Sequence, residues 1–316
     1  MVSAVKPPFV FVHGGWHNSG IWQFVVPALE LQGHFARTLD LPGAGKYVQP
    51  PQSYLRRPLQ MEMFAREYSL SANITQQQRT SAVVSLIEDV VEQTGQKVIL
   101  VAHALGGLTA SAVAESIPEH LLTVVYLTGF MLPPGMTALE QIRHETMATA
   151  GVPSLFLADP DAVHAVRIDP RSPDDTYQSK LRHAFFADVS DEVCAREIPR
   201  LHCDEPLGVF LTPTSTTPAR FGRVPRNYIR CLEDQAIPWT GQNFMIHAVD
   251  GAMGGATRAH DLASSHSPFY SRPNELAELL LWIAQSSLPI GERSNYRTPY
   301  EACSGPIEAQ RRLIVR

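Results

Sequence analysis

Residues 98–110, VILVAHALGGLTA, constrain the fold more than any other stretch of this 316-residue chain. The segment begins with a short run of aliphatic residues, which is typical of a strand buried on both faces. Small residues follow at once and continue into a segment of helical composition. The segment therefore predicts a sharp strand–turn–helix junction, and Ala104 occupies the tip of the turn.

Similar blocks of strand and helix surround this junction. Buried strands are predicted at residues 8–13, 35–41, 97–102, 123–128, 227–232 and 257–263. Helices are predicted at residues 21–32, 75–94, 105–116 and 274–285, with another from about Pro238. Alternation of this kind is typical of a mostly parallel, doubly wound sheet covered by helices on both faces.

Two segments interrupt the alternation. Residues 43–73 carry prolines, aromatics and arginines without clear periodicity, and residues 132–223 contain short helical pieces broken by proline. We predict an α/β core formed by residues 1–131 and 224–316, with an inserted, mainly helical cap at 132–223. The cap and residues 43–73 are expected to roof a pocket together. Residues 43–73 contain Arg56, Arg57 and Arg66. These arginines either bind a carboxylate of the substrate or are simply solvated.

Composition excludes several classes of partner. The formal net charge is −5, and no basic stripe favours nucleic acid or an anionic membrane. No apolar run is long enough to cross a bilayer, and the first residues lack the pattern of a signal peptide. The four cysteines show no CxxC spacing, so we expect reduced thiols, no metal site and a cytoplasmic location. Pairing of Cys194 with Cys203 is the alternative for an exported chain.

The junction at Ala104 has the pattern of a nucleophile elbow, Gly-x-Ser-x-Gly. The turn is crowded, so the positions two before and two after its tip must be small, and Ala102 and Gly106 meet that demand. The N–H of Leu105 is expected to point at the reaction centre, near the positive end of the helix dipole. Only the nucleophilic hydroxyl is missing.

A second candidate element follows the first strand, in the sequence HGGWH at residues 13–17. Glycines allow the backbone to approach a substrate closely, so we expect the N–H of Gly15 to stabilise a developing oxyanion. Trp16 and Phe130, which follow strand ends, are expected to line the pocket. His17 either touches the substrate or caps the turn.

Asp234 and His266 complete the candidate site. Each follows a predicted strand, and the order nucleophile, acid, histidine is typical of α/β-hydrolase triads. The histidine takes the proton of the nucleophile, and the carboxylate fixes the imidazole tautomer. Three other residues are less suited to these roles, and they are Glu233, His247 and His260. His103 is expected to be buried behind the elbow.

The stretches FVHGGWH, VAHALGG, YIRCLEDQAIP and SSHSPFYSRPNELAELL resemble the α/β-hydrolase superfamily. The chain is most similar to the branch of plant methylesterases, hydroxynitrile lyases and bacterial pyrethroid-type carboxylesterases, over residues 8–131 and 224–285. The resemblance implies an ester-cleaving site at Ala104, Asp234 and His266, with the amides of Gly15 and Leu105 as oxyanion hole. It calls for no cofactor and implies a small-molecule ester or lactone as substrate, and a homodimer stays open. The apolar residues of the cap and of residues 43–73 predict a medium-sized, largely apolar substrate.

The sequence departs from that pattern in ways that matter. The family's serine is Ala104 here, and the lyases' lysine and threonine are replaced by Ser267 and Gly14, which speaks against lyase activity. Three accounts of the alanine compete. In the first, alanine was engineered in place of the serine of an active esterase to trap substrate. In the second, the chain is by nature a small-molecule binding protein or receptor. In the third, its chemistry uses no serine and depends, for example, on a water activated by histidine. The surviving acid, base and glycines favour the first account.

Overall fold

Parallel strands form the central sheet of the structure, a computed structural model that describes residues 6–289. Its strands are β1 (Phe9–Val12), β2 (Ala36–Thr38), β3 (Val98–His103), β4 (Leu121–Leu127), β7 (Arg226–Cys231) and β8 (Arg258–Leu262). Their order across the sheet is β2-β1-β3-β4-β7-β8, and each neighbouring pair is parallel. This arrangement confirms the predicted α/β-hydrolase fold, and it brings the carboxyl ends of the strands to one edge.

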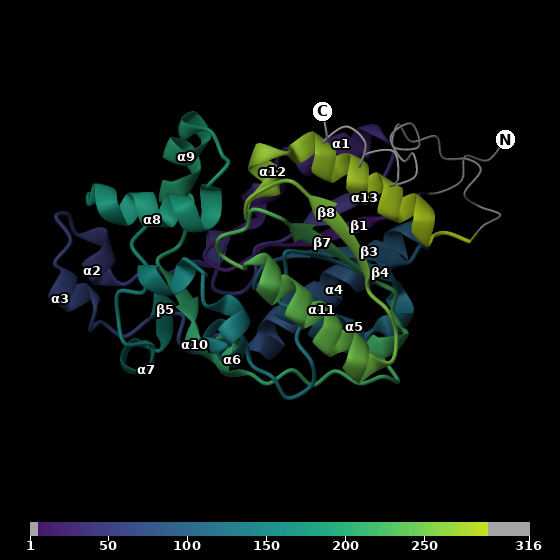
Figure 1. Ribbon diagram of the computed structural model, residues 1–316, viewed down its shortest axis with the longest axis horizontal. Helices are drawn as coiled ribbons and strands as arrows, with labels where there is room; N and C mark the ends of the chain where they lie inside the picture. The colour runs from purple at the N-terminus through teal and green to yellow at the C-terminus, as the bar shows by residue number, and fades with distance from the viewer. Residues whose placement is uncertain (1–5, 290–316) are drawn as a thin grey trace, which may run out of the picture.

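Side chains of each strand alternate between two apolar layers. In β3, Ile99 and Val101 pack with one face of the sheet, and Leu100 and Ala102 pack with the other. The first face is covered by α1 (Val25–Leu31) and α13 (Pro273–Ser287), and the second by α4 (Gln76–Thr94), α5 (Gly106–Ser116) and α11 (Trp239–Met253) (Figure 1). Burial on both faces explains why these strands are continuously apolar in sequence.

Local signals set where the helices begin and end. Thr75 and Gln78 form a capping box at the start of α4, and Gly95 ends the helix with φ +67°. The helix predicted over residues 21–32 is instead a 3₁₀ turn, Ser19–Trp22, followed by α1 from Val25. Pro27 explains the difference, because an α-helix starting at residue 21 would place this proline in its interior.

Most of residues 132–223 lie beyond the end of the sheet, on the left of Figure 1. The last residues of the segment run back along α5, where the amides of Thr217 and Phe221 donate to the side chain of Glu115. The helices of residues 132–223 are α6 (Ala138–Arg143), α7 (Pro160–Val163), α8 (Asp175–Phe186), α9 (Asp191–Glu197) and α10 (Leu207–Leu211), with 3₁₀ turns at Glu145–Met147, Val152–Leu155, Ile198–Arg200 and Phe221–Arg223. The segment also contains a small antiparallel pair that the sequence did not predict, β5 (Ala165–Arg167) and β6 (Asp204–Pro206).

Residues 43–73 pack against this antiparallel pair. They form a 3₁₀ turn, Gly45–Tyr47, and the short helices α2 (Gln52–Leu55) and α3 (Met61–Phe64). The guanidinium of Arg167 donates to the carbonyl of Glu67 at 2.8 Å, and the amide of Ser69 donates to the carbonyl of Val163 at 2.9 Å. The short helix α12 (Pro268–Ser271) follows β8 and leads into α13.

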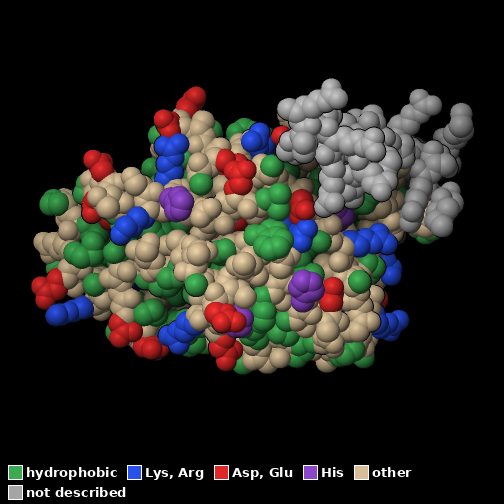
Figure 2. Space-filling view, in the orientation of Figure 1, with side chains coloured by type: hydrophobic (Ala, Val, Ile, Leu, Met, Phe, Trp, Pro, Cys, Tyr) green, Lys and Arg blue, Asp and Glu red, His purple; other side chains and the backbone are tan. Residues whose placement is uncertain are grey.

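Between residues 6 and 289 the structure contains no helix that is both long and apolar enough to traverse a bilayer. The same range holds no cluster of three or more His, Cys, Asp or Glu side chains that could bind a metal. Cys194, Cys203 and Cys231 are buried free thiols, and Cys303 lies outside the described residues. Acidic and basic side chains are interspersed on the face shown in Figure 2.

Candidate active site

Ala104 lies in the turn between β3 and α5, as the sequence predicted. Its φ is +45°, a left-handed conformation that is costly for any residue with a Cβ. Its amide donates to the carbonyl of Leu127 at 3.2 Å. Its carbonyl accepts from the amides of Gly107 and Phe130, at 3.0 and 2.8 Å. These bonds to the neighbouring strand and loop hold the strained turn in place.

The glycines after Ala104 are required by close packing. A Cβ on Gly106 would lie 2.4 Å from the carbonyl oxygen of His13, and one on Gly107 would lie 2.6 Å from that of Phe130. Both separations are far below van der Waals contact. Helix α5 therefore approaches the loops after β1 and β4 as closely as a backbone can, which brings position 104 next to the glycine loop.

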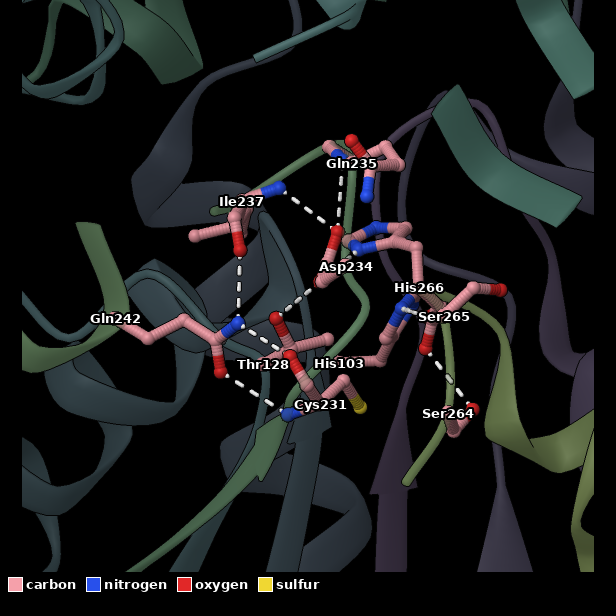
Figure 3. A network of polar contacts seen from close by, with 12 residues as sticks. His103, Thr128, Cys231, Asp234, Gln235, Ile237, Gln242, Ser264, Ser265 and His266 are labelled. Atoms are coloured by element: carbon pink, nitrogen blue, oxygen red, sulfur yellow. Dashed lines mark hydrogen bonds and ion pairs between the residues drawn. The ribbon is translucent and has the colours of Figure 1, made fainter. Parts of the chain in front are cut away.

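Asp234 and His266 are in hydrogen-bond contact at the carboxyl end of the sheet (Figure 3). The Nδ1 atom of His266 lies 2.8 Å from Oδ2 of Asp234, and both residues are buried. Oδ1 of Asp234 accepts from the amides of Ala236 and Ile237, at 2.7 and 2.9 Å. A carboxylate held in this way orients the imidazole, with Nδ1 as the protonated nitrogen and Nε2 left as the proton acceptor.

The loop that carries Asp234 is fixed by Gln242 of α11. Its side-chain oxygen accepts from the amide of Cys231 at 3.1 Å. Its side-chain nitrogen donates to the carbonyls of Cys231 and Ile237, at 2.9 and 2.8 Å (Figure 3). Gln242 is fully buried, so these bonds tie the end of β7 to the turn after Asp234 without competition from water.

Thr128 is a site residue that the sequence analysis missed. Its hydroxyl donates to Oδ2 of Asp234 at 2.5 Å, the same oxygen that faces His266. Thr128 follows β4 with φ +38°, another strained position for a β-branched residue. Strain at a buried residue that contacts Asp234 indicates that the threonine helps to fix the direction of the carboxylate.

We expect Thr128→Val to lower kcat about tenfold in a chain that carries serine at position 104, because Asp234 loses one of its donors while the shape of the residue is kept. The measurement is steady-state ester hydrolysis. Thr123→Val is the matched control, since Thr123 is a buried threonine at the opposite end of β4. Equal effects of the two substitutions would contradict a role of Thr128 at the site.

Gly15 and Leu105 both line the cavity that Ala104 and His266 also line. The backbone amide of neither residue donates a hydrogen bond within the described part of the chain. Two carbonyls of the loop that contains Gly15 are hydrogen-bonded to histidine side chains. His13 Nδ1 lies 2.8 Å from the carbonyl oxygen of Gly14, and His17 Nδ1 lies 2.7 Å from that of Gly15. Two free amides beside position 104 are the geometry that a developing oxyanion requires.

The cavity that joins these groups is almost entirely apolar. Ala104, Leu105, Gly15 and His266 line its floor. Trp16 and Phe130, predicted to line the pocket, do so. The remaining walls come from Ile142, Met147, Ala150, Val152, Pro153, Phe185, Phe210, Ala236 and Ile237. Most of these residues belong to 132–223, and their short, broken helices gave no sequence signal that would have identified them.

Residues 43–73 do not roof this cavity, and that expectation was wrong. None of them is among its lining residues, because the segment packs on the outer side of β5 and β6. Arg57 instead pairs with Asp169 at 3.2 Å, and Arg66 pairs with Glu62 at 3.2 Å. Arg56 is exposed and also lies outside the cavity.

None of the other candidate histidines lines the cavity, and neither does Glu233. His103 is buried and its Nε2 lies 2.9 Å from the carbonyl of His266, so it supports the backbone of His266. His17 caps the glycine loop and does not line the cavity. Glu233 and His247 are exposed, and His260 bonds to the side chain of Asn227.

Burial lowers the pKa of His13 and of His17 from 6.5 to about 3, so both are neutral in the folded protein. In the unfolded chain both imidazoles become protonated below pH 6.5, whereas in the folded protein they stay neutral. The two histidines therefore do not reduce the stability of the fold above that pH, and the free energy of unfolding decreases as the pH falls from 6.5 toward 3. We expect the free energy of unfolding to drop by on the order of 2 kcal/mol per histidine between pH 7 and pH 5.

Urea unfolding at the two pH values measures this loss. The variant His17→Gln is expected to show a smaller drop than the parent. His183→Gln, which changes an exposed histidine of α8, is the control and should leave the drop unchanged. Identical pH dependence in all three proteins would contradict the prediction.

Comparisons with known proteins find relatives that match most of the chain. The chain is 29% identical over 288 residues to a putative chloroplastic methylesterase 11 of Arabidopsis thaliana, and the match covers 88% of this chain and 64% of that protein, less than two thirds of its length. It is 26% identical over 287 residues to the pyrethroid hydrolase of Sphingobium wenxiniae, covering 88% and 87% of the two chains.

A solved structure with a similar fold is that of a pyrethroid hydrolase from Sphingobium faniae. The TM-score is 0.67 at 22% identity, and the match covers 89% of this chain and 98% of the other. A family profile described as "Alpha/beta hydrolase family" matches residues 9–279, which is most of the chain. The relatives include ester hydrolases, as the resemblance implied. The chain therefore belongs to the alpha/beta hydrolase family.

Proposed function

We propose that this site cleaves a carboxylic ester or lactone when position 104 carries serine, and that the chain with Ala104 binds such a substrate without turning it over. The observation that carries the proposal is the set of groups around the methyl group of Ala104. An Asp234–His266 pair and two free amides, those of Gly15 and Leu105, line or adjoin a single apolar cavity with Ala104 on its floor.

In the proposed mechanism, each of these residues has a defined role. A hydroxyl at position 104 attacks the carbonyl carbon while Nε2 of His266 takes its proton, and Asp234 stabilises the resulting imidazolium. The amides of Gly15 and Leu105 hold the oxyanion, which is worth about 3 kcal/mol per donor in comparable sites. His266 then protonates the leaving alcohol, and a water molecule releases the acid from the acyl-enzyme by the same route.

The walls of the cavity indicate the substrate. They expose aliphatic and aromatic side chains and no charged group apart from the His266 ring when it is protonated. Binding therefore depends mainly on removal of apolar surface from water, which favours a neutral, medium-sized apolar ester or lactone. We assign residues 132–223 as the cap, because they supply most of these walls.

A crystal of the chain as it stands, soaked with apolar esters and lactones, tests the proposal. The carbonyl oxygen of the trapped compound is expected within hydrogen-bond distance of both the Gly15 and Leu105 amides. Its carbonyl carbon is expected above the methyl group of Ala104. A compound bound with its carbonyl turned away from both amides would contradict the proposal.

A second candidate function is small-molecule binding without catalysis, and Ala104 itself is the observation that favours it. The alanine leaves the apolar cavity complete while it removes the only side chain that could form an acyl-enzyme at the elbow. The two functions differ in one measurement. A binding protein would hold its ligand tightly and would gain no ester turnover when serine is placed at position 104.

A further inference from the structure

The glycine loop at residues 13–17, here called the oxyanion loop, is clamped from the side opposite the cavity. The amide of Trp16 donates to Oε1 of Glu205 at 2.7 Å, and the carbonyl of Trp16 accepts from the amide of His202 at 2.8 Å. Both partners lie at or beside β6. Trp16 has φ +59°, which is costly for a bulky residue, so the loop keeps this shape only while surrounding groups impose it.

The carboxylate that holds Trp16 is itself paired in the interior. Oε2 of Glu205 accepts from Nη2 of Arg79 at 3.0 Å, and the two side chains are 0% and 3% exposed. Arg79 comes from α4, and its Nε also donates to the carbonyl of Pro42 at 3.2 Å. A buried ion pair gives little net stability, because removing both charges from water costs about what their attraction returns. Its location directly behind the oxyanion loop points to another purpose.

The side chain of Glu205 lies beside Gly15, which carries one of the two proposed oxyanion donors. A Cβ built on Gly15 would lie 3.6 Å from Cγ of Glu205. An unpaired carboxylate beside Gly15 would repel an oxyanion in a medium of low dielectric constant. Arg79 cancels that repulsion while Glu205 keeps its hydrogen bond to Trp16.

We propose that Arg79 and Glu205 are positioning residues for the oxyanion hole: Glu205 fixes the loop that presents the Gly15 amide, and Arg79 neutralises the carboxylate behind it. The inference rests on the proposed function for its catalytic part. It assigns a role to two residues that touch neither the substrate nor the reacting atoms.

The test uses the chain with Ala104→Ser and an apolar p-nitrophenyl ester. We expect Arg79→Met to lower kcat about 100-fold with KM changed less than threefold, because the uncompensated charge acts on the transition state more than on the neutral substrate. Glu205→Gln alone should cost tenfold or less, since its amide oxygen still accepts from Trp16. Combining the two should restore kcat to within about tenfold of the Ala104→Ser chain, because the uncompensated charge is then gone.

Two matched controls separate this role from a loss of folding. Arg226→Met and Arg226→Met/Asp250→Asn disrupt another ion pair, joined at 3.3 Å at the start of β7, and should leave kcat unchanged. Arg79→Lys, which keeps the charge, should retain most of the activity. If Arg79→Met and the double variant lose kcat equally, or if only KM rises, the charge argument is overturned.

Hydrogen exchange of the oxyanion loop tests the clamp without any activity. In the chain with Ala104, Glu205→Leu is expected to speed exchange of the amides at residues 14–17, and Glu205→Gln is expected to leave it slow. Unchanged exchange in Glu205→Leu would overturn the positioning role even if the esterase is active. Faster exchange in a chain whose serine variant is inactive would support the clamp and would refute the proposed function instead.

Discussion

Ala104→Ser is expected to hydrolyse a short p-nitrophenyl ester at least about 1,000-fold faster than the parent chain. The reason is that the acid, the base and the oxyanion donors are already in place, and only the attacking oxygen is absent. A serine at this position inherits the strained φ of +45°, which the bonds from Leu127, Gly107 and Phe130 impose on any residue there. The substitution therefore adds a nucleophile without asking the backbone to move.

Rapid mixing of the serine variant with excess ester measures both the burst of p-nitrophenol and the steady rate. A burst equal to the enzyme concentration would show an acyl-enzyme at position 104. Ala104→Ser/His266→Gln is the control that keeps the hydroxyl and removes its base, and it should return the rate to that of the parent. A serine variant with neither burst nor turnover across a panel of esters and lactones would contradict the hydrolase proposal and favour the binding function.

The sequence predicted those parts of the structure that local chemistry determines. The apolar runs of β1, β3 and β4 predicted buried strands. The small residues after His103 predicted a tight turn, and the structure leaves no room for a side chain at Gly106 or Gly107. Parallel strands end at one edge of a sheet, so residues that follow strand ends were expected to meet. The structure does bring Asp234 to His266, although their catalytic roles stay predictions.

Other parts depend on contacts between distant segments, and the sequence held no signal for them. Thr128 looks like an ordinary strand threonine until the fold places Asp234 beside it. Arg79 lies on a long helix, 126 residues before the Glu205 that it meets. The strands β5 and β6 are three residues each, too short to show an alternating pattern. The wrong position predicted for residues 43–73 has the same cause, because their partner is this small sheet.

The largest loss of stability is expected from Arg167→Leu, which should lower the free energy of unfolding by about 3–5 kcal/mol. Arg167 is fully buried and holds Asp204 through two hydrogen bonds of 2.7 Å. It also donates to the carbonyls of Phe64 and Glu67, and its guanidinium lies 4.7 Å from the centre of the Phe64 ring. Leucine would leave a carboxylate and two carbonyls without donors in the interior.

Urea unfolding of the parent, Arg167→Leu and Arg167→Leu/Asp204→Leu separates the cost of the unpaired charge from the cost of lost packing. The double variant should recover part of the stability, because it removes the buried carboxylate that the single variant strands. Arg182→Leu is the matched control, since Arg182 pairs with the exposed Asp191 and should change stability by less than about 1 kcal/mol. A decrease of less than about 1 kcal/mol in the free energy of unfolding of Arg167→Leu would contradict the prediction. It would mean that residues 43–73 stay attached to β5 and β6 without this arginine, and that water hydrates Asp204 in its place.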